Sequence, residues 1–180
     1  MKILGTGCGY NKHRRNNPKD VIIGLDKSKI PCVDMVWDLE KTRLPFRKNE
    51  FDVVYASHVL EHVQNVTNLI KGIHRTLKPR GKFFITVPHF SWNFAFWGLS
   101  HIYYFGIHSL DPLIENQEFT WVGYSFSIKT PLFKLIKKRI ETSKLWFFIE
   151  KFANKFPDIY EKIGLKCIFP ASCIHFELEA

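Results

Sequence analysis

The sequence has few of the residues that would indicate an extracellular or zinc-bound protein. Four cysteines occur in 180 residues, and none forms a C-x-x-C pair or has the spacing of zinc ligands; they are Cys8, Cys32, Cys167 and Cys173. Isolated cysteines are typical of reduced thiols inside a cell rather than of a disulfide framework. We therefore expect a cytoplasmic protein with no metal site.

Acidic residues are also scarce. Asp and Glu total 17 against 26 Lys and Arg, which gives a formal net charge of +9 at pH 7. This balance favours anionic partners such as phosphates, nucleic acid or an acidic membrane surface, without choosing among them. Charge alone therefore names no substrate.

We also expect no targeting segment, and the sequence has no internal repeat. Met1 and Lys2 lead directly into apolar residues, so we expect no secretory signal peptide. Residues 83–107 contain no Asp, Glu, Lys or Arg and are long enough to span a bilayer. Pro88, His89, Asn93 and His101 interrupt this stretch, which favours a buried strand followed by an aromatic flap.

The residues that are present predict a single α/β domain over 1–180. Hydrophobic residues make up 46% of the chain, enough for a substantial core. Short continuous apolar runs are typical of strands in a mainly parallel sheet. They lie at residues 3–4, 21–25, 33–37, 51–56 and 83–87. Apolar residues at helical spacing from Val59 to Leu77 predict a crossover helix, so we expect a doubly wound, Rossmann-like fold.

The C-terminal half has a different pattern. Alternating apolar residues at 122–128 and 174–178 predict two strands with one polar face, the second being an antiparallel C-terminal edge strand. Residues 131–163 between them predict a helical insertion. Basic and large apolar side chains in residues 131–156 fit packing on the domain or on a homodimer partner, and they also fit peripheral contact with an anionic membrane.

A glycine-rich turn follows the first predicted strand. Gly5, Gly7 and Gly9 allow the backbone to approach a ligand closely, because no Cβ stands in the way. Asp26 ends the second apolar run, where an acid can accept both hydroxyls of a ribose. Asp38 ends the third run and could meet an adenine edge. Together these positions indicate a ligand that contains adenosine.

Two later motifs, "FDVVYASHVLEH" and "LKPRG", follow the glycine turn, Asp26 and Asp38 along the chain. Across residues 3–88 the sequence resembles the class I S-adenosylmethionine-dependent methyltransferases, in particular the small-substrate, type 11 branch. The resemblance implies S-adenosylmethionine as cofactor, bound by residues 1–88. It implies a small-molecule, lipid or glycan acceptor on the side of residues 89–180. The implied ligands are Gly5, Gly7, Cys8 and Gly9 beside the methionine part, Asp26 on the ribose, Asp38 and Leu39 on the adenine, and Ser57 with His58 beside the sulfonium.

Three features differ from that family. An acid is usual two residues before the first glycine, where this chain has Ile3 or Gly5; Arg80 replaces a glycine of "LKPGG"; and the N-terminal covering helix is expected to be absent. A degenerate or non-catalytic S-adenosylmethionine-binding protein is therefore the alternative.

Other enzyme classes fit the sequence less well. A nicotinamide dehydrogenase would have G-x-G-x-x-G, and this turn reads G-x-G-x-G. The chain has "ASHV" where many nucleic-acid methyltransferases have an Asn/Asp-Pro-Pro-aromatic segment, which argues against a nucleic-acid acceptor.

Three histidines at or beyond strand ends are candidate catalytic bases: His58, His89 and His101. A structural histidine is the alternative for each. Glu61 and His62 are interpreted as the start of the crossover helix, where negative charge suits the N-terminus. We expect the aromatic flap to form the wall of the acceptor pocket; its rings are Phe90, Trp92, Phe94, Phe96, Trp97, Tyr103 and Tyr104.

Overall fold

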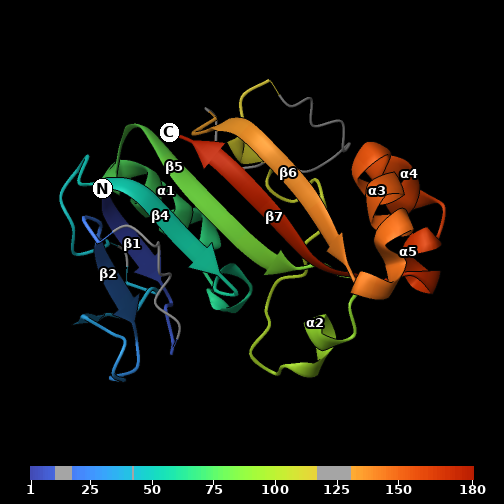
Figure 1. Ribbon diagram of the computed structural model, residues 1–180. Helices are drawn as coiled ribbons and strands as arrows, with labels where there is room; N and C mark the ends of the chain where they lie inside the picture. Colours follow the sequence, from blue (N-terminus) through green and yellow to red (C-terminus); the bar gives the residue numbers. More distant parts are fainter. Residues whose placement is uncertain (11–17, 42, 117–130) are drawn as a thin grey trace.

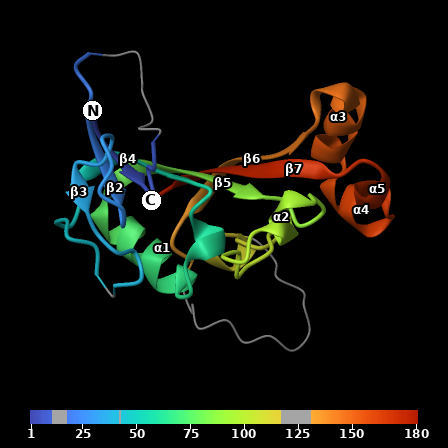
Figure 2. The same ribbon diagram turned by 90° about the horizontal axis from the view of Figure 1, so that it is seen from below.

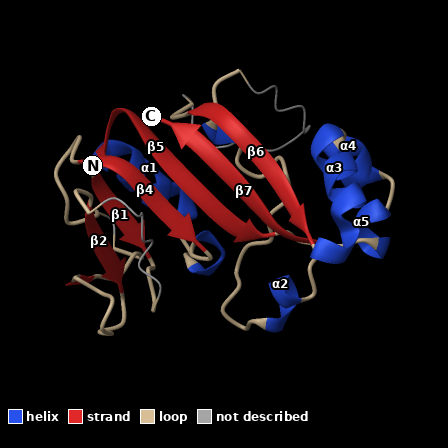
Figure 3. Ribbon diagram, viewed as in Figure 1, coloured by secondary structure: helices blue, strands red, loops and turns tan. Residues whose placement is uncertain are grey.

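The computed structural model describes residues 1–10, 18–41, 43–116 and 131–180. It forms a seven-stranded sheet with the strand order β3-β2-β1-β4-β5-β7-β6 (Figures 1 and 3). The strands are β1 (Lys2–Thr6), β2 (Val21–Asp26), β3 (Met35–Val36), β4 (Phe51–Ser57), β5 (Leu77–Pro88), β6 (Lys134–Thr142) and β7 (Ala171–Glu179). The helices are α1 (Val66–Thr76), α2 (Phe94–Trp97), α3 (Phe147–Lys155), α4 (Pro157–Lys162) and α5 (Leu165–Ile168), with 3-10 turns at Leu60–His62, Asp111–Leu113 and Lys144–Trp146.

The first five strands are parallel, as the apolar runs predict. Each run lies in or overlaps a strand, and β1 pairs with β2 on one side and with β4 on the other. The pairing places Leu4 beside Ile23 and Val54, and Leu4 and Val54 are fully buried. The α/β, Rossmann-like fold with a mainly parallel sheet is therefore confirmed.

The crossover helix α1 packs on one face of this sheet (Figure 2). Asn65 caps it, because the Asn65 side chain accepts a hydrogen bond from the Asn68 amide at 3.2 Å. Leu69, Ile70 and Ile73 share the buried side of the helix. The helix begins later than the apolar spacing suggests, because residues 60–62 form a 3-10 turn first.

The C-terminal part of the sheet differs from the expected helical arm. Residues 134–142 form β6, which is antiparallel to β7 and takes the outer edge of the sheet. Cross-strand pairs of opposite charge stabilise this register, since Lys134 lies opposite Glu179 and Lys137 opposite Glu177. The antiparallel C-terminal strand is confirmed as β7, which lies between β5 and β6. The strand expected at 122–128 lies outside the described residues.

The helical insertion before β7 is also confirmed, as α3, α4 and α5. Tyr160 of α4 anchors it: its side chain is fully buried, and its hydroxyl donates a hydrogen bond to the Phe169 carbonyl at 2.6 Å. Burial raises the pKa of Tyr160 to about 12, so this hydroxyl stays protonated. Within the described residues, no helix is long and apolar enough to cross a membrane.

Candidate active site

The carboxyl ends of β1, β2, β4 and β5 point toward the same edge of the sheet, the edge near α2 (Figure 1). In open parallel sheets, ligands bind in the crevice outside these strand ends. The glycine turn follows β1, Asp26 ends β2, and Ser57 ends β4. The topology therefore brings together the segments predicted to hold the donor.

Asp26 and the glycine turn are joined directly. The Gly9 amide donates a hydrogen bond to Asp26 Oδ2 at 3.0 Å, and the Ser28 amide donates one to Oδ1 at 2.9 Å. The Cys8 amide donates to the Leu25 carbonyl at 3.1 Å, which extends the pairing of β1 with β2 beyond the strand. The carboxylate is thereby fixed beside the turn and remains partly exposed.

The residues after β3 are more loosely held. Asp38 is exposed, and its Oδ1 accepts a hydrogen bond from the Glu40 amide at 3.0 Å, as in an Asx turn. Leu39 is half-buried and packs against the core. The Trp37 amide donates to the Asp26 carbonyl at 2.8 Å, so this segment is connected to the end of β2.

His58 follows β4 in a left-handed backbone conformation, with φ at 54°. Its Nε2 lies 3.9 Å from Cys173 Sγ, and its Nδ1 lies 3.3 Å from Glu61 Oε1. These two neighbours, Cys173 first and Glu61 second, raise the pKa of His58 to about 10. At neutral pH the ring is therefore an imidazolium, which supplies positive charge rather than a free base.

The other two candidate histidines lie in different surroundings. His89 is fully buried; its Nδ1 lies 2.8 Å from Ser91 Oγ and its Nε2 lies 3.1 Å from Glu161 Oε1. These bonds connect the end of β5 to α4. His101 is partly exposed, and its Nδ1 lies 2.8 Å from the Ala95 carbonyl. His89 is therefore held by contacts of its own, whereas His58 and His101 both lie near the Glu61 carboxylate.

The flap carries exposed rings that contact one another. Phe94 and Trp97 have ring centroids 4.3 Å apart, and Phe96 stacks on Tyr104 at 4.6 Å. All four side chains are about half exposed or more. They are not core residues, and their role as an acceptor wall stays a prediction.

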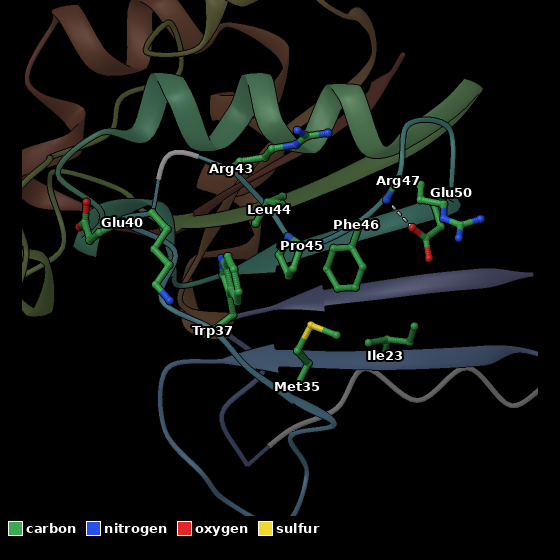
Figure 4. Close-up of a pocket in the computed structure, with 11 residues that line it drawn as sticks. Ile23, Met35, Trp37, Glu40, Arg43, Leu44, Pro45, Phe46, Arg47 and Glu50 are labelled. Carbon is green, nitrogen blue, oxygen red and sulfur yellow. Dashed lines mark hydrogen bonds between the residues drawn. The ribbon is translucent and has the colours of Figure 1, made fainter.

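A cleft of about 970 Å³ lies elsewhere, between the β2–β3 edge and the segment that leads to β4 (Figure 4). Ile23 and Met35 face Pro45 and Phe46 across it, and charged residues such as Arg43 surround its rim. The sequence predicts a pocket beside the aromatic flap and gives no indication of this cleft.

Sequence reasoning also missed the position of Glu61. It was expected on the first turn of the crossover helix, but it lies in the 3-10 turn before α1 and its side chain is fully buried. The pattern "LEH" gives no sign of this burial, because Glu61 is covered by residues far along the chain.

Comparison with known proteins agrees with this geometry. A family model described as "Methyltransferase domain" matches residues 5–85. The chain is 33% identical over 85 residues to the sterol 4-C-methyltransferase strm-1 of Caenorhabditis elegans, which covers 47% of this chain and 24% of that protein. It is 35% identical over 77 residues to the uncharacterized methyltransferase sll0829 of Synechocystis, which covers 42% of this chain and 36% of that protein. The chain thus spans about a quarter to a third of these relatives.

A solved structure shows the same fold over the whole chain. A SAM-dependent methyltransferase from Archaeoglobus fulgidus superposes with a TM-score of 0.63 at 13% identity, covering 99% of this chain and 86% of that one. The strand order and this superposition show that the chain has the Rossmann-like fold of that methyltransferase. Residues 5–85 are similar to the type 11 family of methyltransferase domains.

The cofactor that this family implies is S-adenosylmethionine, and the turn has room for it. Gly9 has φ at 48°, and a Cβ added there would meet no atom of the described residues within 4 Å. The described residues therefore leave space beside the backbone at Gly9. A partly exposed carboxylate, Asp26, lies beside that opening. The residues present fit the adenosine and methionine parts of the donor.

The two glycines of the turn provide a matched pair of substitutions. A Cβ at Gly7 would lie 2.4 Å from Val59 Cγ2, whereas one at Gly9 would contact none of the residues that the structure describes. Both positions have positive φ, so each alanine costs about 1–2 kcal/mol of strain. Overpacking against Val59 adds roughly 1–3 kcal/mol for Gly7→Ala alone. Urea unfolding should therefore show the larger loss of stability for Gly7→Ala, while calorimetry should show that Gly9→Ala, though folded, binds S-adenosylmethionine more weakly. Equal losses of stability would contradict the close approach of Gly7 to Val59.

Proposed function

We propose that the protein is an S-adenosylmethionine-dependent methyltransferase with a small-molecule acceptor. The observation that carries the proposal is the hydrogen bond between the Gly9 amide and Asp26, which joins an open glycine turn to a partly exposed acid at two adjacent strand ends. Residues 1–88 would hold the donor, and residues 89–180 would face the acceptor.

The mechanism follows from positioning. S-adenosylmethionine would supply an electrophilic methyl group on a sulfonium, from which a neutral thioether departs as a good leaving group. The Asp26 carboxylate would accept hydrogen bonds from the ribose hydroxyls, and Asp38 and Leu39 would contact the adenine. Gly5, Gly7, Cys8 and Gly9 would border the methionine part, with Ser57 and His58 beyond it. Holding donor and acceptor in line can supply much of the rate enhancement without a dedicated base.

We further propose that the acceptor is a lipid, which the protein reaches at a membrane surface. Leu145 is 85% exposed and Phe148 is 72% exposed, and both lie at the start of the insertion. Lys151 lies 5.0 Å from the centre of the Phe147 ring, which places positive charge beside these apolar groups. Large apolar side chains next to basic ones suit the headgroup boundary of a bilayer. The name of the nematode relative, a sterol methyltransferase, supports an acceptor of this class.

The alternative, a donor-binding protein without turnover, has an observation of its own. The family's usual acid before the glycine turn is replaced by Ile3 or Gly5, both buried within β1. Neither can pair with the amino group of the donor. The donor would then be held mainly through its adenosine part.

One experiment separates the two functions. Calorimetry measures binding of S-adenosylmethionine, and release of S-adenosylhomocysteine is then followed with sterols and other small acceptors in phospholipid vesicles. Binding with product release supports the methyltransferase, and binding without release from any acceptor supports the alternative. Absence of binding to a folded protein would contradict both.

A further inference from the structure

A cluster of three potential metal ligands lies beside the candidate active site. Glu61, His62 and His101 each offer one ligand atom, and the three atoms lie within 4.8 Å of one another. The rings of His62 and His101 meet edge to face with centroids 4.7 Å apart. None of the donor-binding roles proposed above uses these side chains.

The carboxylate of Glu61 is buried without a hydrogen-bond donor from the part of the chain that the structure describes. Its side chain is fully buried, and neither oxygen has a hydrogen-bond partner among the described residues. A charged neighbour is His58, whose Nδ1 lies 3.3 Å from Oε1. His58 lies near Oε1 alone, so Oε2 has no polar partner among the described residues. A buried carboxylate oxygen without a partner is costly, so a cation bound at Oε2 would be favoured.

Each of the two histidines contacts a backbone carbonyl through its Nδ1. His62 Nδ1 lies 3.1 Å from the Ser100 carbonyl, and His101 Nδ1 lies 2.8 Å from the Ala95 carbonyl. A carbonyl oxygen can only accept, so each Nδ1 must carry the proton. In the neutral rings both Nε2 atoms then keep a lone pair for a metal ion. A backbone carbonyl on the other ring nitrogen is the common outer support of a ligating histidine.

Backbone contacts hold these residues together across about forty positions of sequence. The Ile102 amide donates to the Glu61 carbonyl at 2.7 Å, and the Tyr103 hydroxyl donates to the Gln64 carbonyl at 2.6 Å. The segment that carries His101 is therefore docked on the turn that carries Glu61 and His62. The cluster is preorganised rather than a chance encounter of mobile side chains.

We propose that Glu61, His62 and His101 bind one divalent transition-metal ion. Two imidazoles and one carboxylate suit ions of the Zn²⁺ or Co²⁺ type better than Mg²⁺ or Ca²⁺, which prefer oxygen ligands. Metal–ligand bonds are about 2.0–2.2 Å long, so the ligand atoms need to close by roughly 1 Å around the ion. The expectation of no metal rested on cysteine spacing, which does not bear on a histidine and carboxylate site.

Three protein ligands leave at least one coordination position open for water. The cluster lies between His58, at the end of β4, and the aromatic flap, so an oxygen of the acceptor could also take that position. This second role rests on the proposed methyltransferase function. Metal binding itself does not, and it is measured without any methyl donor.

The test is titration of the full chain with Co²⁺ and Zn²⁺. Co²⁺ should give visible absorption bands of a site with nitrogen ligands at one equivalent per chain, and Zn²⁺ should displace it. His62 is exposed, so His62→Ala should fold normally, as circular dichroism would confirm. Since loss of even an outer partner weakens metal binding about 10- to 100-fold, His62→Ala and His101→Ala should each weaken it at least that much.

The matched control is His175→Ala, which removes a histidine from another pair with a carboxylate, His175 with Glu141 at 2.6 Å. This variant should bind Co²⁺ as the wild type does. Absence of stoichiometric Co²⁺ binding to the wild type would overturn the proposal, and so would equal weakening by all three variants. Metal binding without methyl transfer would contradict only the methyltransferase function.

Discussion

Replacement of Asp26 by alanine is expected to weaken S-adenosylmethionine binding about 10- to 150-fold. Hydrogen bonds to a charged group contribute about 1.5–3 kcal/mol, and every 1.4 kcal/mol is a factor of ten in affinity. The substitution removes the proposed ribose acceptor and also the partner of the Gly9 amide. Titration calorimetry on the wild type and the variant measures the effect directly.

The control for this prediction is on the same strand. Asp20 immediately precedes β2, at the end opposite Asp26, and pairs with the N-terminal amine at 2.9 Å. Asp20→Ala should leave donor affinity unchanged. If a folded Asp26→Ala variant bound the donor as tightly as the wild type, the assignment of the whole donor site would be wrong.

The second large effect concerns vesicle binding. Full burial of a leucine or phenylalanine side chain contributes about 1.5–3 kcal/mol, so loss of Leu145 and Phe148 should weaken membrane affinity about 100-fold or more. We expect a Leu145→Ser, Phe148→Ser double variant to lose co-sedimentation with vesicles that contain acidic phospholipid. Salt should weaken binding of the wild type, because basic groups add an electrostatic contribution.

A comparison variant shows whether any exposed apolar side chain would have this effect. Val21 is 59% exposed at the start of β2, at the other side of the sheet from α3 (Figure 1). Val21→Ser should bind vesicles as the wild type does. No binding of the wild type to either acidic or neutral vesicles would leave packing as the role of the insertion.

The parallel half of the sheet could be predicted because each of its strands contains or overlaps a continuous apolar run, which is typical of strands buried on both faces. The arm from residue 131 could not, for a physical reason. Leu132, Ile136 and Ile140 are four residues apart, and a spacing of four fits a helical face and also an alternating strand. What decides in favour of β6 is its pairing with β7, where Glu177 and Glu179 meet the lysines of β6. That information lies about forty residues further along the chain.

The site divides in a similar way. A contiguous motif such as the glycine turn could be placed in the candidate site from the sequence, because it directly follows a strand and strand ends are visible in the local pattern. The cluster around Glu61 depends on residues 95–103 folding back over the turn at 60–62, and no local pattern reports such a contact. The pKa of His58 likewise depends on Cys173, a residue 115 positions away.

The place of β7 in the sheet governs the order in which the chain can be completed during synthesis. β6 is translated before β7, yet its strand pairing within the described residues is with β7 alone. Until the ribosome has released residues 171–179, β5 has an open edge and β6 has no strand to join. Unpaired edges of this kind attract other chains. A nascent chain that stalls after α5 would therefore expose two unpaired strand edges at once, and protection by a chaperone matters most until residues 171–179 have emerged.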